Sequence, residues 1–325
     1  MDPKQLRIVF MGTPEFAVES LKGLVENGYN MMGVITAPDK PAGRGLKMAE
    51  TAVKKFAVQS GLPVLQPEKL KNPAFLEELS ALKADLQVVV AFRMLPEAVW
   101  AMPSLGTFNL HASLLPQYRG AAPLNWAIIN GEKETGVTTF LLSHEIDTGK
   151  ILFREKEPVL PGETVGELHD RLMVKGARLV VKTVDTLAAG NYSPISQEEL
   201  LAEAGMLKAA PKIFREDMRI DWNQPAETIR NLVRGLSPWP AAWTILRHRE
   251  TGTETEMKIF MAENGNPAEE GTLPGTLRSD GKKRLEVLCR DRWLQITDLQ
   301  LAGKKRMKTE EFLRGFHQIS EYTAD

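Results

Sequence analysis

The first half of the chain alternates short apolar runs with stretches whose apolar residues recur every three or four positions. The run Leu6–Met11 is followed by a helical pattern and then by a second apolar run, Met31–Ile35. Strand, helix and strand in this order predict a βαβ unit, and therefore a parallel sheet with both faces covered. The same reading predicts further strands at 63–65, 86–92, 108–111 and 136–142, and helices at 51–60, 73–82, 123–130 and 163–187.

The pattern changes near residue 190. Residues 191–211 are polar without a strong period, which predicts a linker. A helical stretch at 225–236 then precedes short strand-like runs separated by Gly, Pro and Asp, as in a small β-barrel or sandwich. We therefore predict an α/β domain over residues 1–190, a linker over 191–211 and a small β-domain over 212–325.

Composition narrows the class of protein. The 325 residues are 43% hydrophobic and 26% charged, which is ordinary for a folded protein of about two domains. A net charge of -1 excludes a strongly basic binder. A lone Cys289 excludes an intramolecular disulfide and a cysteine zinc cluster, and since HExxH and EF-hand patterns are absent we expect no metal. Without a signal peptide or a long apolar run, the expected location is the cytoplasm.

Candidate chemistry lies at the ends of two of the predicted strands. Asn109 and His111 are two residues apart, so on a strand both side chains point to one face. An amide and an imidazole there can stabilise negative charge that develops on one carbonyl oxygen, as acyl-type transfer requires. Asp147 follows the next strand and is the candidate carboxylate that orients the imidazole.

The residues alone leave alternatives open. His111 could be a structural histidine, and His144, three residues before Asp147, competes for the same role. No Ser, Cys or Lys nucleophile has a recognisable elbow or base pattern, and direct transfer between two substrates needs none.

A polar loop follows the second predicted strand. Its sequence, PDKPAGRG at Pro38–Gly45, is not a dinucleotide fingerprint because GxGxxG is missing, so a nicotinamide cofactor is disfavoured. The loop is either an ordinary connection or, with Lys40, Arg44 and Lys47 close in sequence, a grip on phosphate.

Taken together, these segments resemble the methionyl-tRNA formyltransferases, and the resemblance spans nearly the whole chain. The motifs that carry it are RIVFMGTPEFA at Arg7–Ala17, PDKPAGRG at Pro38–Gly45, VVVAF at Val88–Phe92, NLHASLLPQYRGAAPLNWAI at Asn109–Ile128, IDTGKIL at Ile146–Leu152, IDW at Ile220–Trp222, RGLSPWPAAW at Arg234–Trp243 and LAGKKRM at Leu301–Met307. The fourth and fifth motifs are shared with other formyltransferases that use 10-formyltetrahydrofolate.

The resemblance implies a fold and a set of roles. The fold is a Rossmann-like open parallel sheet, the formyltransferase domain, followed by an OB-like β-barrel that contacts tRNA. Asn109 would bind the formyl oxygen, His111 would stabilise the oxyanion or move a proton, and Asp147 would orient His111. This resemblance selects His111 over His144.

The resemblance also implies the binding residues and partners. The folate-binding segment is Ser113, Leu114, Leu115 and Pro116. The tRNA-binding residues are Lys40 and Arg44 in the loop and Lys304, Lys305 and Arg306 in the tail. The donor is 10-formyltetrahydrofolate, the acceptor is initiator methionyl-tRNA, and we expect a monomer without membrane association.

Two departures from the family pattern bear on the predicted site. Phe92-Arg93 stands where many members have Tyr-Gly, and Glu145-Ile146 precedes Asp147 where Gly-Leu is common. Two other functions remain as alternatives: a formyltransferase for a small amine such as glycinamide ribonucleotide or an amino-sugar nucleotide, and a tRNA-binding protein without activity. The tail from about residue 210 argues against the first, and the intact Asn109, His111 and Asp147 argue against the second.

Overall fold

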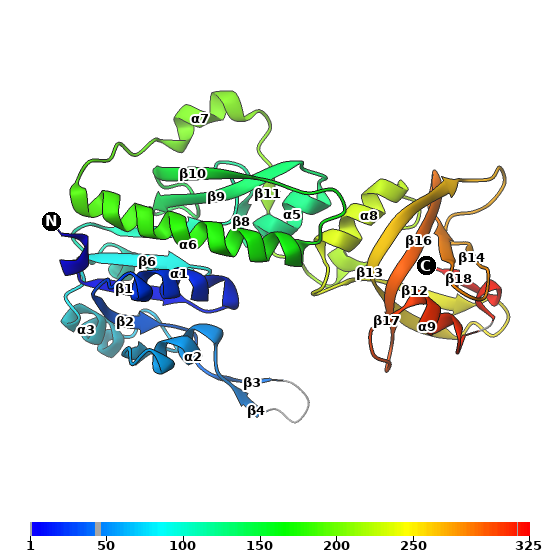
Figure 1. The fold of residues 1–325 in the computed structure, drawn as a ribbon, viewed down its shortest axis with the longest axis horizontal. Helices are drawn as coiled ribbons and strands as arrows, with labels where there is room; N and C mark the ends of the chain where they lie inside the picture. The colour runs from blue at the N-terminus through cyan, green and yellow to red at the C-terminus, as the bar shows by residue number, and fades with distance from the viewer. Residues whose placement is uncertain (1, 43–46, 317) are drawn as a thin grey trace. The chain divides into compact units, whose positions relative to one another are not determined.

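The computed structural model describes residues 2–42, 47–316 and 318–325. The chain forms two compact units (Figure 1). Unit 1 contains residues 1–120, 134–158 and 169–209, and unit 2 contains residues 121–133, 159–168 and 210–325. Among the described residues, no helix is both long and apolar enough to cross a membrane.

Unit 1 is built on a seven-stranded sheet in the order β10-β9-β7-β6-β1-β2-β5. The five strands from β7 to β5 are parallel, while β9 is antiparallel to β7 and β10 is antiparallel to β9. The strands are β1 (Ile8–Gly12), β2 (Met31–Ile35), β5 (Val64–Leu65), β6 (Leu86–Val90), β7 (Thr107–His111), β9 (Glu134–Leu141) and β10 (Ile151–Pro158).

The helices of this unit are α1 (Glu15–Glu26), α2 (Ala52–Gln59), α3 (Pro73–Ala81), α4 (Glu97–Trp100), α6 (Val165–Ala189, which begins in unit 2) and α7 (Gln197–Ala204), with a 3-10 turn η1 (Pro3–Gln5). Four of them, α1, α2, α3 and α6, match predicted helical stretches, whereas the short α4 and α7 were not predicted. Thr51 and Asn72 cap α2 and α3 through their side chains, which explains where these helices begin. At the end of β1, a Cβ on Gly12 would lie 2.6 Å from Cβ of Ala17, so the glycine permits the close packing of strand and helix.

Strand β10 was not predicted. Its residues Arg154, Glu155, Lys156 and Glu157 alternate between partly buried and exposed, so the strand lacks the apolar run that marks the central strands. It lies at the edge of the sheet, where charged residues are common because one side of the strand has no partner.

The predicted linker is partly ordered. Residues 191–209 belong to unit 1 and include α7. Ser196 caps the start of this helix, because its side chain accepts a hydrogen bond from the backbone N–H of Glu198. Ile195 forms a two-way backbone bridge with Ile151 at the start of β10. The predicted boundaries at 190 and 211 remain predictions.

Unit 2 is centred on an antiparallel sheet in the order β14-β15-β16-β13-β12-β18, with β17 paired to β16. The two ends of this path meet where Thr276 bridges Thr323 and Ala324 N–H bonds Gly275 O at 2.9 Å, which nearly closes a barrel. The strands are β12 (Ala242–His248), β13 (Glu254–Pro267), β14 (Leu277–Ser279), β15 (Leu285–Leu288), β16 (Arg292–Leu301), β17 (Met307–Lys308) and β18 (Tyr322–Ala324).

The core of unit 2 is formed by residues on the inner side of the barrel and on α8 (Ala226–Gly235). It includes Trp222, whose Nε1 donates to Thr244 Oγ1, and buried Ile229 and Val233. The remaining helices are α5 (Pro123–Ile129), α9 (Thr309–Leu313) and the 3-10 turns η2 (Glu216–Met218) and η3 (Ile319–Glu321). The predicted fold class, a Rossmann-like sheet followed by a barrel-like β-domain, is confirmed.

Two short two-stranded sheets complete the described strands. In unit 1, β3 (Lys40–Ala42) pairs with β4 (Lys47–Ala49), so the polar loop is carried on two strands. Its base is held by Asp39, which pairs with Lys54 and accepts a hydrogen bond from Gln66, and these contacts lower the pKa of Asp39. The short strands β8 (Arg119–Gly120) and β11 (Ala209–Ala210) also pair.

Candidate active site

The end of β7 carries the first two predicted residues. Asn109 and His111 alternate along the strand with Leu110, and Val89 and Phe140 flank Asn109 in the sheet. The Asn109 Oδ1 atom is buried without a hydrogen-bond partner among the described residues. An unsatisfied buried amide atom is unfavourable in a core, so this side chain fits a group that bonds a ligand.

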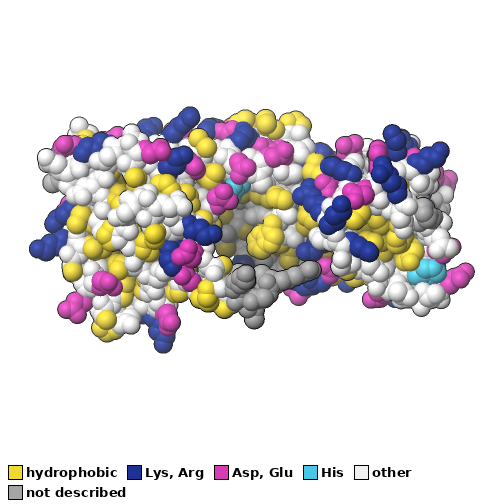
Figure 2. Space-filling view, turned by 60° about the horizontal axis from the view of Figure 1, so that its bottom comes forward, with side chains coloured by type: hydrophobic (Ala, Val, Ile, Leu, Met, Phe, Trp, Pro, Cys, Tyr) yellow, Lys and Arg dark blue, Asp and Glu magenta, His cyan; other side chains and the backbone are white. Residues whose placement is uncertain are grey.

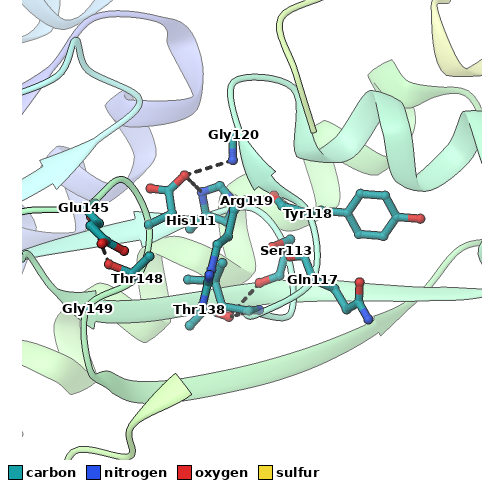
Figure 3. A network of polar contacts seen from close by, with 12 residues as sticks. His111, Ser113, Gln117, Tyr118, Arg119, Gly120, Thr138, Glu145, Thr148 and Gly149 are labelled. Atoms are coloured by element: carbon teal, nitrogen blue, oxygen red, sulfur yellow. Dashed lines mark hydrogen bonds and ion pairs between the residues drawn. The ribbon is translucent and has the colours of Figure 1, made fainter. Parts of the chain in front are cut away.

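His111 is held from two sides (Figure 3). Only 7% of its side chain is exposed. Its Nε2 lies 2.8 Å from the backbone oxygen of Tyr118, and because a carbonyl only accepts, Nε2 carries the proton of this bond. Its Nδ1 lies 3.9 Å from Asp147 Oδ2, which is longer than a hydrogen bond. Nδ1 therefore makes no hydrogen bond to the carboxylate and is left for a ligand group.

Asp147 reaches His111 by an unexpected route. The two residues were predicted to meet because both follow strands, but β9 is antiparallel to β7, so the end of β9 lies beside Phe108 at the start of β7. The loop between β9 and β10 brings Asp147 back toward His111. There its Oδ2 accepts a hydrogen bond from the Gly120 backbone N–H at 3.0 Å, and 12% of the side chain is exposed.

The backbone around this pair is unusual. Asp147 and Tyr118 have positive φ angles of 55° and 61°, and Ala91, just after β6, has one of 47°. Non-glycine residues in this region typically cost about 1–3 kcal/mol and cluster at functional sites. A Cβ on Gly149 would lie 1.6 Å from Leu141 O, so only glycine allows the Asp147 loop to pack against β9.

The predicted folate-binding segment is largely buried. Ser113, Leu115 and Pro116 are buried, and Leu114 is partly buried. Thr138 on β9 fixes the segment, since its Oγ1 donates to Ser113 O at 2.6 Å and accepts from Leu115 N at 3.2 Å. Any contact of this segment with a ligand would therefore involve its backbone and Leu114 more than the other side chains.

Two residues that the sequence reasoning missed complete the network around Asp147. The Nε2 of Gln197 donates to the backbone oxygens of Asp147 and Gly149, both at 2.8 Å. Its Oε1 accepts from Arg119 Nε and Nη2 at 3.0 and 2.7 Å. Arg119 lies within the motif at Asn109–Ile128, although no role was assigned to it. Gln197 lies in the predicted linker, where no motif or periodic pattern marked it.

His144 is placed quite differently from His111. Its side chain is 74% exposed, and Nε2 lies 3.7 Å from Glu97 Oε1, which is itself 63% exposed. Its ring contacts Trp100 edge-on, with the centroids 5.3 Å apart. It does not join the network around Asp147 among the described residues.

The two departures from the family pattern also have defined positions. Arg93 donates to the backbone oxygens of Glu68 and Pro67, and so ties the segment after β6 to the segment after β5. Burial lowers the pKa of Arg93. Glu145 is exposed, and its backbone oxygen accepts from Thr148 Oγ1 at 3.1 Å. Its side chain therefore lies outside the network.

The predicted tRNA-binding residues differ in how they are held. Lys40 is exposed on β3, and Arg44 lies outside the described residues. In the barrel, Lys304 and Lys305 are exposed, and Lys305 pairs with Glu311 at 2.9 Å. Arg306 instead makes two hydrogen bonds to buried Asp298 and lies over Phe260. Lys and Arg side chains gather over the barrel, at the right of Figure 2.

Other chemistry finds little support. Burial raises the pKa of the Cys289 thiol to about 12, which makes it a poor nucleophile. Among the described residues, no group of three or more His, Cys, Asp or Glu side chains could hold a metal ion.

Comparison with known proteins gives the family. The model for formyl transferase matches residues 6–184, and the model for the formyl transferase C-terminal domain matches residues 212–317. A methionyl-tRNA formyltransferase from Parabacteroides distasonis is 60% identical over 324 residues, with 99% of each chain covered. The chain belongs to the methionyl-tRNA formyltransferase family. One from Bacteroides thetaiotaomicron is 55% identical over 323 residues, again with 99% of each chain covered.

Solved structures share the fold at lower identity. An N-formyltransferase from Helicobacter canadensis, in complex with folinic acid and dTDP-3-aminofucose, has a TM-score of 0.64 and 18% identity, with 93% of this chain and 100% of that chain covered. The protein HypX from Aquifex aeolicus, in complex with tetrahydrofolic acid, has a TM-score of 0.61 and 19% identity, with 95% of this chain and 47% of that chain covered. The predicted family membership is confirmed.

Proposed function

We propose that the protein transfers the formyl group of 10-formyltetrahydrofolate to the α-amino group of initiator methionyl-tRNA. The observation that carries this proposal is 60% identity over 99% of both chains to a protein of that name. The Asn109 amide, whose oxygen has no partner among the described residues, lies on the same strand face as the fixed ring of His111. It supports the proposal because an amide NH2 group and an imidazole N–H can both donate to an oxygen that gains negative charge.

The transfer replaces one carbon–nitrogen bond with another. The amine nitrogen bonds the formyl carbon, the bond from that carbon to folate N10 breaks, and one proton passes from the amine to N10. The Asn109 NH2 group stabilises the oxygen between these two events together with a doubly protonated His111, whose Nε2–H is bonded to Tyr118 O and whose Nδ1–H faces the substrate oxygen. Asp147 orients the His111 ring, and loss of one such donor typically slows a reaction by about 100- to 1000-fold.

Recognition of the acceptor is assigned to two parts of the chain. The loop with Lys40 and Arg44 contacts the acceptor end of the tRNA, and Lys304, Lys305 and Arg306 on the barrel contact its phosphates. Because Arg306 is already held by Asp298, we assign most of the barrel's contribution to the freer Lys304 and Lys305. The segment Ser113–Pro116 lines the folate site. The protein acts as a monomer in the cytoplasm.

The test is a comparison of acceptors with the full chain. Methionyl-tRNA, free methionine and glycinamide ribonucleotide are each incubated with the donor, and the formylated product is measured by mass spectrometry. We expect formylation of methionyl-tRNA alone. Preferred formylation of a small amine would overturn the proposal in favour of the alternative activity.

The assignment of the barrel is tested separately. The double variant Lys304→Glu with Lys305→Glu should raise KM for methionyl-tRNA about tenfold or more while KM for the folate donor changes little, because each phosphate contact adds to the salt-dependent part of binding. The matched control is Lys282→Glu with Lys283→Glu, in a turn fixed by Asp280. An equal effect of the two double variants would contradict the assignment.

A further inference from the structure

We infer that Gln197, anchored by Arg119, is a positioning residue for Asp147. The inference rests on the proposed function for its kinetic readout. Gln197 is the first residue of α7 and is only 2% exposed. It is far from Asp147 in sequence, yet its side chain bonds the loop on which Asp147 lies.

The hydrogen bonds of the Gln197 side chain are complete. Its two N–H bonds are both used, one to the backbone oxygen of Asp147 and one to that of Gly149. Its oxygen accepts two N–H bonds from Arg119. This arrangement also fixes the orientation of the amide, because a flipped group would face two carbonyl oxygens with an oxygen and two guanidinium donors with an NH2.

The same segment holds Asp147 from two directions. Gly120, next to Arg119, donates its backbone N–H to the Asp147 carboxylate at 3.0 Å. Arg119 reaches the backbone of Asp147 through Gln197. The carboxylate and the main chain of Asp147 are therefore both fixed relative to residues 119 and 120, which directly follow Tyr118, the residue whose carbonyl holds His111.

The loop needs such support because its backbone is unfavourable alone. Asp147 has a positive φ of 55°, and Gly149 is packed against Leu141 too closely for any side chain. The start of α7 is itself secured, since Ile195 bridges Ile151 and Leu200 packs on the cluster of Leu115, Phe140 and Ile151. Gln197 thus links a stable part of unit 1 to the loop that carries the carboxylate.

The substitution Gln197→Glu separates this role from folding. The carboxylate keeps an oxygen that accepts from Arg119 and gains an ion pair with it, but its second oxygen offers no donor to Asp147 O and Gly149 O and repels them. In thermal unfolding the ion pair should offset much of this loss, whereas kcat should fall about 10- to 100-fold, as displacement of a catalytic group by about 1 Å typically does. KM values for both substrates should change much less than kcat.

The control is another buried glutamine of unit 1. Gln87 on β6 is fully buried and accepts from Thr107 Oγ1 at 3.0 Å, but it makes no hydrogen bond to the Asp147 loop among the described residues. Gln87→Ala should lower the unfolding temperature and leave kcat near the wild-type value. A similar loss of kcat in both variants would mean that lower stability of the fold, and not lost positioning of Asp147, explains the effect of Gln197→Glu. That result would overturn the inference.

A double-mutant cycle supplies the decisive comparison. If Gln197 acts through Asp147, Gln197→Glu should cost less than about twofold in kcat in a background of Asp147→Asn, because groups that act as one unit are not additive. Losses that multiply would refute the inference.

A second readout does not need catalysis. In NMR spectra at fixed pH, the ring Cε1–H resonance of His111 should shift in Asp147→Asn, and Gln197→Glu and Arg119→Lys should shift it in the same direction. A resonance that moves in Asp147→Asn but not in the other two variants would overturn the inference. Absence of formylation by the wild type with intact NMR behaviour would instead refute only the proposed function.

Discussion

His111 is the last residue of β7, and His144 follows the end of the neighbouring strand β9. Each histidine lies near an acidic side chain. His111 is 7% exposed, with one nitrogen fixed by a backbone carbonyl and the other facing Asp147. His144 is 74% exposed and faces Glu97, which is 63% exposed. An exposed pair of this kind is screened by water and typically contributes about 0–1 kcal/mol. The difference lies in how firmly each ring is held, which spacing in the sequence does not reveal.

The largest expected effect comes from replacing each of the two histidines by alanine. His111→Ala should lower kcat for formylation of methionyl-tRNA about 1000-fold, because the ring supplies both a donor to the developing oxyanion and a route for a proton. His144→Ala should leave kcat within about twofold, in line with its exposed position. The measurement is steady-state kinetics of both variants at saturating substrates.

Affinity for tRNA gives the control. Because His111 is 7% exposed and far in sequence from the assigned tRNA-binding residues, His111→Ala should bind methionyl-tRNA about as tightly as the wild type. If His144→Ala were the variant that lost turnover, the catalytic role would have to move to the exposed ring.

The acidic neighbours of the two histidines, Asp147 and Glu97, should differ in the same way, with a smaller effect on kcat. Asp147→Asn retains an oxygen that accepts the Gly120 N–H but removes the negative charge beside His111, so kcat should fall about 100-fold. Glu97→Gln makes the same chemical change beside His144 and should have almost no effect on kcat. Equal losses in the two variants would show that the charge acts over a distance and not through a fixed ring.

Much of this comparison could be predicted from the sequence, and its limits are physical. Apolar runs predicted the central strands because these are buried on both faces, and β2 matches the expected residues 31–35. Strand β10 was missed because charged edge strands have no such run. Asp147 was chosen correctly as a neighbour of His111 by a wrong route, since apolar runs do not show that β9 is antiparallel.

The supporting residues were the hardest to foresee. Gln197 and Asp147 are brought together by the bridge between Ile195 and Ile151, and a single polar residue in a polar segment gives no periodic signal. The positive φ angles at Asp147 and Tyr118 belong to residues other than glycine, so composition did not mark them either.

A third prediction concerns the segment beside His111. Thr138→Val keeps the shape of the side chain but leaves Ser113 O and Leu115 N without their buried partner, which should destabilise unit 1 by about 1–3 kcal/mol. Ser143→Ala removes an exposed hydroxyl that contacts Thr148 near His144 and should change stability by less than about 0.5 kcal/mol. Denaturant unfolding of both variants makes the measurement, and equal stabilities would contradict the structural role of Thr138.

The smallest expected effect on turnover concerns Asp298, a buried carboxylate beside cationic side chains. It tests whether such burial is enough to make a carboxylate functional. Asp298 in the barrel is 5% exposed, like a site residue, but its partners Arg306 and Lys308 are charged at any neutral pH. Burial alone would raise the pKa of Asp298, but the hydrogen bonds and charges of Arg306 and Lys308 outweigh it, so the pKa is lowered. Asp147 differs because its neighbour is an imidazole, that of His111, and not a guanidinium or ammonium group.

The sign of the pH effect follows from this shift. A carboxyl whose pKa is lower in the folded state stabilises the fold above its unfolded pKa of about 4, and this contribution is lost as the pH falls through the folded value. Asp298→Asn should therefore lower the unfolding temperature of the barrel at pH 7 and make its dependence on pH below about 4 less steep. Turnover of Asp298→Asn at saturating tRNA should stay near the wild-type value. In Asp147→Asn, by contrast, turnover should fall while the unfolding temperature stays near that of the wild type. A loss of turnover in Asp298→Asn with unchanged stability would contradict this distinction, because a buried carboxylate beside a guanidinium group would then also serve turnover.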